Sequence, residues 1–369
     1  MLQIQNLFFN SPNLHSFSMS LYGNYGGCVV RIPQFENVTS FRFTGNEKFP
    51  PLEELKLDGY PIGDTEWLHW QQGLDWSKLT SLTIGPQSAF GILKHLAGYA
   101  TSLKTLRVFR YPDEGWQNQS TDRDALGLEK LLRSFDGLET LEVKGVPVAV
   151  DVVGGHRRLK RLCLHEDESA YKNVERKLLS AEEMGFLDKR CPDLRDLKVK
   201  VKIGDNEMNK DLLQKLATSF QNLCSLSLHF EIGLATLSKT TKAPLRTTSA
   251  LEIGKSFFDI RRNSGIEVTP WFTLTLWTGN YFRRWPQWQP GYAGAEKKLS
   301  ATFEFSVPDG QSDGVQMRHL EKEELNSYES GKRHSRAMAM FRVQDLSSRV
   351  KAVSEDPSGG KGWDSDGDL

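Results

Sequence analysis

The sequence predicts an α/β solenoid, in which helices cover one face of a single parallel sheet. Three observations predict this fold class. A short phrase with leucine at its first, fourth and sixth positions returns along the first two-thirds of the 369-residue chain. Within the phrase, apolar and polar residues alternate, which is typical of a strand with one buried face. Between the phrases, apolar residues recur at the i, i+3, i+4, i+7 spacing of amphipathic helices.

Copies of the phrase predict the strands in chain order. The clearest copies begin at Leu52, Leu79, Leu103, Leu138, Leu159, Leu194 and Leu223, and weaker copies cover 14–19, 38–43 and 271–276. Self-similarity at irregular spacings of about 21–35 residues is the signature of a leucine-rich-repeat solenoid, or horseshoe. Stacking of the repeats is expected to bury the leucines between concave strands and convex helices, since a single strand cannot hide them alone.

Four segments between the phrases predict the helices, and they cover 65–76, 89–99, 124–135 and 211–220. Burial of each large aliphatic side chain contributes about 1.5–3 kcal/mol, so a repeat is expected to be stable only when its neighbours complete the burial. The asparagine that often follows the strand in regular repeats is replaced by Asp58-Gly59 and by Gly85-Pro86. The loops are therefore expected to be uneven and to lack an asparagine ladder.

The two ends of the solenoid carry different signals. Residues 1–10 offer no polar cap, so the chain is expected to enter in mid-repeat. The solenoid is expected to cover 1–307 and to end in an aromatic segment over 268–307, where a strand over 299–307 lies beside four tryptophans. The tryptophans are Trp271, Trp277, Trp285 and Trp288. They either close the last repeat or form a platform for a sugar, a base or a proline-rich peptide.

The last segment, 308–369, has a polar composition that cannot sustain a core. It is expected to be a mostly disordered tail with short helical segments over 316–326 and 336–353. The protein has 47 basic and 47 acidic residues, so no global field favours nucleic acid or anionic lipid. No apolar run is long enough to span a bilayer. Neither nucleic acid nor a membrane is expected as a partner.

Cysteine usage and the start of the chain bear on the compartment. The four cysteines have no metal-ligand or disulfide-framework spacing. The first residues lack the basic and apolar regions of a secretory signal. We therefore expect reduced thiols in an intracellular protein of the cytoplasm or nucleus. No metal, cofactor or catalytic residue is expected, and the protein is not expected to be an enzyme. The one set to check is Glu142, Cys163 and His165, which we expect to be too dispersed for catalysis.

The period of two assigns the residues of the concave face. The candidate partner-binding residues are Lys56, Asp58, Arg107, Phe109, Glu142, Lys144, Arg161, His165, Asp196, Lys198, Lys200 and His229. This mixture of charges with few aromatic rings fits a protein or peptide partner better than a polyanion. The alternative is a simple solvated inner face. Lys198, Lys200 and Lys202 alternate with valines, so all three are expected to point one way, towards solvent or towards an acidic patch of a partner.

Two phrases carry a resemblance to a known family. Residues 191–199, Cys-Pro-Asp-Leu-Arg-Asp-Leu-Lys-Val, resemble the cysteine-containing leucine-rich repeats attached to F-box domains. Residues 74–82 and the late aromatic block over 272–290 are similar to phrases of fungal F-box/leucine-rich-repeat proteins. The resemblance covers the repeat portion, about 1–307, without a recognisable F-box. It implies a substrate receptor of a cullin-type ubiquitin ligase, which would bind the ligase adaptor only through an F-box upstream. A free-standing scaffold is the alternative.

Overall fold

The structure is a computed structural model, and its described residues carry the repeats. They are 2–20, 41–43, 45, 47–60, 62, 64–85, 91–110, 121–165, 178–201, 208–231, 245–278, 301–308 and 314–320. Almost all of them belong to the first of two compact units, Met1–His319. Among them, no helix has both the length and the apolar character needed to cross a membrane.

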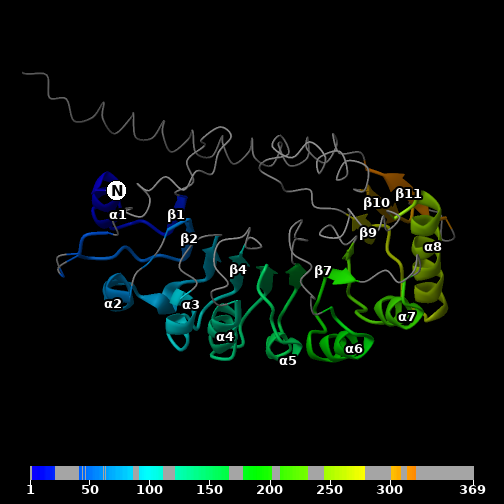
Figure 1. Cartoon of the computed structure of the whole chain (residues 1–369), viewed down its shortest axis with the longest axis horizontal. Helices are drawn as coiled ribbons and strands as arrows, with labels where there is room; N and C mark the ends of the chain where they lie inside the picture. Colours follow the sequence, from blue (N-terminus) through cyan, green and yellow to red (C-terminus); the bar gives the residue numbers. More distant parts are fainter. Residues whose placement is uncertain are drawn as a thin grey trace, which may run out of the picture. The chain divides into compact units, whose positions relative to one another are not determined.

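The described strands form one unclosed sheet in which chain order is also spatial order (Figure 1). They are β1 (Ser16–Ser20), β2 (Glu54–Asp58), β3 (Ser81–Ile84), β4 (Thr105–Phe109), β5 (Thr140–Lys144), β6 (Arg161–His165), β7 (Asp196–Val201), β8 (Ser225–Phe230), β9 (Thr273–Thr278), β10 (Ala301–Ser306) and β11 (Gln316–His319). Strands β1 to β9 pair in parallel, whereas β9, β10 and β11 pair antiparallel. The fold is therefore a mixed α/β, solenoid-like array.

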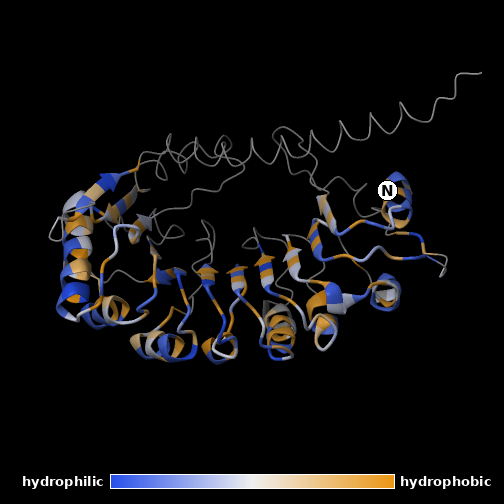
Figure 2. Cartoon of the chain, turned by 180° about the vertical axis from the view of Figure 1, so that it is seen from behind, coloured by the Kyte–Doolittle hydropathy of each residue, from blue (hydrophilic) through white to orange (hydrophobic). Residues whose placement is uncertain are grey.

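Helix α1 precedes β1, and the other helices occupy connections between the parallel strands, on one side of the sheet (Figure 1). They are α1 (Leu2–Phe9), α2 (Asp64–Gly73), α3 (Gly91–Leu96), α4 (Thr121–Leu132), α5 (Val150–Val153), α6 (Ala181–Arg190), α7 (Lys210–Thr218) and α8 (Thr247–Asn263), with a short 3-10 helix, η2 (Trp76–Lys78). The opposite side of the sheet is called the open face below. In Figure 2 the strands show alternating apolar and polar residues, as a sheet with two unlike faces requires.

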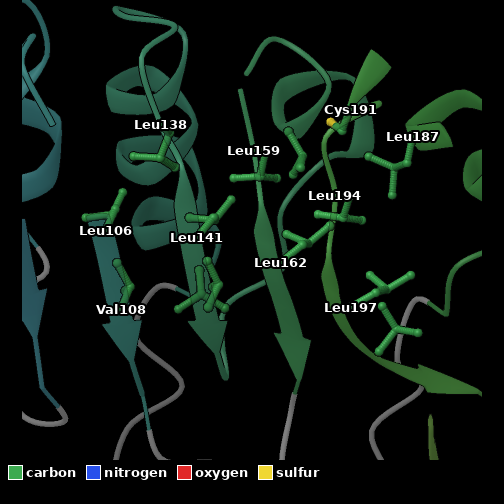
Figure 3. Close-up of a cluster of buried hydrophobic side chains, with 14 of the residues drawn as sticks. Leu106, Val108, Leu138, Leu141, Leu159, Leu162, Leu187, Cys191, Leu194 and Leu197 are labelled. Carbon is green, nitrogen blue, oxygen red and sulfur yellow. The ribbon is translucent and has the colours of Figure 1, made fainter. Parts of the chain in front are cut away.

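The core is built from lateral rows of aliphatic side chains. One row runs through successive register partners from β2 to β9, and Figure 3 shows its middle part, from Leu106 to Leu197. Its members are Leu55, Leu82, Leu106, Leu141, Leu162, Leu197, Leu226 and Leu274, each at most 1% exposed. Helix α6 adds Leu187 to the same cluster, and Cys191 follows it (Figure 3). Each strand therefore shares its buried leucine with two neighbours, and the predicted alternation of the strands is confirmed.

Glycine ends two of the strands, where the asparagine of a regular repeat was not expected. Gly59 follows β2 and Gly145 follows β5, with φ angles of 73° and 75°. This left-handed conformation is one that residues with a Cβ atom rarely adopt. At Gly145 a Cβ atom would also lie 2.2 Å from the Arg110 carbonyl oxygen. At both glycines the chain therefore turns sharply as it leaves the strand.

The predicted helices are confirmed with shifted bounds. Those over 65–76, 89–99, 124–135 and 211–220 correspond to α2, α3, α4 and α7. Helices α5, α6 and α8 were not predicted. For α6 a signal exists: the Ser180 hydroxyl accepts from the Glu183 backbone, and the Glu183 carboxylate accepts from the Ser180 backbone. This reciprocal pairing is a capping box, and its Ser-x-x-Glu pattern is visible in the sequence.

At the carboxyl end the sheet turns back on itself. The predicted strand over 299–307 is confirmed as β10, which pairs antiparallel with β9. The predicted helix over 316–326 is wrong at its start, because residues 316–319 form β11. Met317 of β11 lies opposite Phe305 of β10, so pairing and apolar contact outweigh the helical pattern. Gly254 lets α8 approach this strand, since a Cβ atom there would lie 2.3 Å from the Phe305 ring.

Aromatic rings and a buried polar cluster pack together at the amino end of the sheet. Phe8 of α1 packs at ring-centroid distances of 4.7–5.9 Å against Phe17, Phe41, Phe49 and Trp70, among others. A second layer of contacts is polar: the Tyr60 hydroxyl and the Trp70 indole, at 3.0 Å, both donate to the buried Glu66 carboxylate. Burial and the Glu66 charge raise the pKa of Tyr60 far above its ordinary value, so the phenol keeps its proton.

Candidate binding face

Open-face side chains from neighbouring strands line up in lateral rows. In one row, Arg107, Glu142 and Cys163 are successive register partners on β4, β5 and β6, and the row continues through Lys198, Ser227 and Thr275. The next row contains the pairs Phe109–Lys144 and Lys144–His165, and also Lys200–His229 and His229–Trp277. The predicted concave-face residues of β4 to β8 thus share one face, in two adjoining rows and a third nearer the amino ends.

The β4 and β5 end of this face is an ion-pair network centred on Glu142. One carboxylate oxygen lies 3.4 Å from Arg107 Nε and the other lies 3.0 Å from Lys144 Nζ. The Lys144 ammonium also lies 5.0 Å from the centroid of the Phe109 ring. The side chains of Arg107 and Lys144 are 36% and 34% exposed. This network therefore offers two cations to anything that approaches the face.

The β6 to β9 end is a cluster of rings, formed by His165, His229 and Trp277 and called the ring cluster below. Ring centroids are 4.9 Å apart for His165 and His229, 4.1 Å for His229 and Trp277, and 5.0 Å for His165 and Trp277. The Trp277 indole donates to Ser227 Oγ at 3.0 Å, which fixes the ring on the sheet. All three rings are at most 8% exposed. The three rings therefore form a packed, nearly buried cluster at the β6 to β9 end of the open face.

Of the three lysines predicted to point one way, Lys198 and Lys200 lie in different environments. Lys198 Nζ lies 4.7 Å from the centroid of the Trp277 ring, and the residue is half-buried. Lys200 Nζ pairs with Glu231 at 2.8 Å, and its side chain is only 6% exposed. The predicted solvated position of Lys200 is therefore wrong, because Lys200 is buried beside its register partner His229 and pairs with Glu231. Lys202 lies outside the described residues.

The other predicted residues occupy the open face with simpler partners. Arg161 pairs with Asp196 across β6 and β7, with both Nε and a terminal guanidinium nitrogen 3.1 Å from Asp196 Oδ2. Lys56 is exposed on β2, and the Asp58 carboxylate accepts from Ser20 Oγ at 3.4 Å. Neither Lys56 nor Asp58 contacts the ring cluster among the interactions described. The β4 to β9 part of the face is accordingly the candidate site.

The members of the one candidate catalytic set lie on β5 and β6, and two of them have partners outside the set. Glu142 and Cys163 are register partners, but the Glu142 carboxylate pairs with Arg107 and Lys144, towards β4. The His165 ring contacts His229 and Trp277, towards β9. A relay needs a base within hydrogen-bond reach of the nucleophile.

Metal ligation and similarity to known proteins give no further assignment. In the part of the chain that the structure describes, no group of three or more His, Cys, Asp or Glu side chains could hold a metal ion. No protein-family model matches the chain, and no similar sequence is found among curated proteins.

Sequence reasoning gave Trp277 to the closing segment, whereas the structure places it on the open face. The signal was present in the phrase itself, because Trp277 continues the alternation Thr273, Thr275, Trp277 on the side opposite Leu274 and Leu276. Trp271 is 77% exposed and does not fill the end of the sheet. Trp285 and Trp288 lie outside the described residues. Glu231, the partner of Lys200, had no sequence signal.

Proposed function

We propose that this chain is a leucine-rich-repeat horseshoe that recognises a protein partner on its concave face, the open face, without catalysing a reaction. The observation that carries the proposal is the lateral array of β4 to β9, which holds charged, hydroxyl and ring side chains in fixed register. The sheet sets their spacing at about 5 Å between strands and 7 Å along each strand. Such a regular, wide array suits the surface of another protein.

The composition of the array supports a protein partner. Interfaces draw most of their binding energy from a few aromatic and arginine side chains, with polar contacts around them. Here Arg107, 36% exposed, is such a side chain at the β4 end, and half-buried hydroxyl residues lie along the face. These are Thr105, Thr140, Ser225, Ser227, Thr273 and Thr275.

A finer proposal follows from the resemblance to F-box/leucine-rich-repeat proteins. We infer that the bound protein is a substrate delivered to a cullin-type ubiquitin ligase, with a free-standing scaffold as the alternative. The arrangement of residues 191–199 supports it: Cys191 is fully buried after α6, and the phrase continues directly into β7. The free thiols of Cys163, Cys191 and Cys224 support an intracellular setting, in which thiols stay reduced.

The recognition proposal is tested by site-specific photo-crosslinking in cells. A photoreactive amino acid replaces Thr105 or Thr275 on the open face, and in the matched control it replaces the exposed Lys130 of α4. We expect one discrete protein to be crosslinked from both open-face positions and not from position 130. Crosslinking of the same protein from position 130 alone, or of none from the open face, contradicts the proposal.

The ligase proposal is tested separately with the crosslinked protein in hand. Purification of the full-length gene product should recover a cullin and its adaptor, and depletion of the product should lengthen the half-life of the crosslinked protein. An unchanged half-life without recovery of a cullin supports the scaffold instead.

A further inference from the structure

The turns that lead into β4 to β9 form one edge of the sheet, called the flank below. They cover 101–104, 136–139, 156–160, 191–195, 221–224 and 269–272. A lateral row along this flank begins at Lys104 and continues through Glu139, Lys160, Arg195 and Cys224. Each later member donates its backbone amide to the carbonyl of the member before it, at 2.8 Å. The backbone therefore fixes the row, with about 5 Å between neighbours.

Positive charge gathers on the flank around β6. Lys160 Nζ lies 2.7 Å from a Glu139 carboxylate oxygen. The hydrogen bond from Lys160 lowers the pKa of Glu139, and the charges of Lys104 and Arg158 add to this effect, so three cations share one acid. Arg158 and Arg195 are exposed and have no ion pair within the described part of the chain. The charged residues of the whole flank are the cations Lys104, Arg157, Arg158, Lys160 and Arg195 and the acids Asp136, Glu139 and Asp193.

An exposed tryptophan stands at the β9 end of the flank. Trp271 lies in the turn into β9 and is 77% exposed. The next residue, Phe272, is 1% exposed and stacks on the Phe257 ring at a centroid distance of 5.7 Å. The Thr273 amide then donates to the Cys224 carbonyl oxygen at 2.9 Å. The backbone that carries the indole is therefore anchored, while the indole itself stands in solvent.

Arg195 and Trp271 lie within reach of one bound segment. Their turns lead into β7 and β9, which β8 separates, so the two backbones are about 10 Å apart. An extended chain covers that distance in about three residues. Tryptophan and arginine are enriched among the side chains that supply most of the binding energy of an interface. An anchored, exposed tryptophan near an exposed arginine therefore indicates a docking surface.

The chemistry of the flank favours an acidic protein segment. A guanidinium group binds a carboxylate through two parallel hydrogen bonds. The face of an indole ring packs against an apolar or aromatic side chain. A nucleic-acid strand also offers rings and negative charge, but Glu139 and Asp193 on the same flank repel its unbroken run of phosphates. A protein segment with separate carboxylates avoids these two acids.

We propose that the flank from β6 to β9 is a second docking surface, distinct from the open face, for an acidic segment of a protein partner. Trp271 binds an apolar side chain of the segment, and Arg158 and Arg195 bind its carboxylates. This inference goes beyond the proposed function, because it concerns another surface and neither requires nor excludes binding on the open face.

The proposal is tested with displayed random peptides of about twelve residues, selected on the full chain after depletion on the double variant Arg195→Glu, Trp271→Ala. We expect the selected peptides to carry at least two acidic residues within about four positions of an apolar one. A synthetic copy should bind with an affinity that falls as salt rises, measured by fluorescence anisotropy. Arg195→Glu and Trp271→Ala should each weaken binding at least about tenfold. The matched control, Lys130→Glu on α4, should leave affinity within about twofold.

The exposed Cys224 gives an independent readout of position, because its turn lies between those of Arg195 and Trp271. In a Cys28→Ser variant, a benzophenone maleimide attached to Cys224 should crosslink the bound peptide. In the control, Lys130→Cys is added and Cys224→Ser removes the native thiol, so the reagent is attached to α4 instead. This control should give no crosslink.

A charge exchange separates recognition from folding. Arg158→Glu with Arg195→Glu should bind a peptide whose acids are replaced by lysine more tightly than the unmodified chain does, and a merely misfolded variant cannot gain affinity. The proposal is overturned if no peptide is selected, if the selected peptides lack acids, or if Cys224 gives no crosslink. It is also overturned if single-stranded RNA binds with the same dependence on Arg195 and Trp271. None of these outcomes bears on crosslinking from Thr105 and Thr275, so this inference and the proposed function fail separately.

Discussion

At the scale of single residues, a buried guanidinium joins one helix to the end of the preceding helix. Arg261 of α8 is 1% exposed, and its guanidinium donates to the carbonyl oxygens of Ala217, Ser219 and Phe220 at 3.1–3.2 Å. These carbonyls lie at the end of α7 and just beyond it, where a helix leaves acceptors unpaired. Burial lowers the pKa of Arg261 to about 10, so the group remains charged at neutral pH.

Replacement of Arg261 by methionine keeps most of the apolar packing and removes every donor. We expect the free energy of unfolding to fall by roughly 3 kcal/mol or more, because buried carbonyls lose a charged partner. Urea unfolding measures the loss. The neighbouring Arg262 pairs with the exposed Asp259 at 3.6 Å, so Arg262→Met should cost less than about 1 kcal/mol. Equal losses in the two variants would show that the carbonyls do not depend on Arg261.

The thiols give a second prediction at this scale. Burial raises the pKa of Cys191 to about 11, and Cys163 is 6% exposed, whereas Cys224 is exposed. The thiolate is the reactive form, so buried thiols react slowly. In a Cys28→Ser variant, Ellman's reagent should modify one thiol rapidly in the native protein and three in denaturant. The additional substitution Cys224→Ser should abolish the rapid reaction. A fast-reacting Cys191 would contradict the structure.

At the scale of elements, the strand is the unit whose two faces differ. Leu141 of β5 is fully buried between Leu106 and Leu162, and its neighbour Thr140 lies on the open face. Leu141→Ala should lower the free energy of unfolding by about 2–5 kcal/mol, because it leaves a cavity in a core shared by three strands. Thr140→Ala should change it by no more than about 0.5 kcal/mol. Denaturant titrations of both variants measure the two changes. Similar losses of unfolding free energy would contradict the assignment of Leu141 to the core and Thr140 to the open face.

The elements also show what sequence could and could not predict. The faces of β2 to β9 were predictable, since a period of two needs only local pattern. The position of Trp277 was also predictable from that alternation, although a tryptophan near the end of a sheet is more often expected to fill the core. Lys200 was different: it is buried where β7 pairs with β8, beside His229 and in an ion pair with Glu231, and both of these residues are remote in sequence. Such burial follows from tertiary contacts that local spacing does not contain.

At the scale of the whole array, stability is expected to be transmitted mainly between neighbouring repeats, because β1 to β11 pair in chain order. A defect at one end should then loosen that end alone. Trp70 provides the means to test this, because it is fully buried at the amino end. Its ring lies 5.4–5.8 Å from those of Phe8, Phe41 and Phe49.

Trp70→Ala should therefore raise amide hydrogen exchange in β1, β2 and α2 and leave α8 and β9 nearly unchanged, since opening is local where contacts are local. The removed indole also leaves the buried Glu66 with one donor fewer, which adds to the cavity cost of about 3–5 kcal/mol. Exchange followed by mass spectrometry resolves the segments. Trp271→Ala, at a side chain that is 77% exposed, is the matched control and should alter neither end. Uniformly faster exchange from β1 to β9 in Trp70→Ala would instead mean that the array unfolds as one cooperative body, so that a partner bound at β4 to β9 would stabilise the amino end as well.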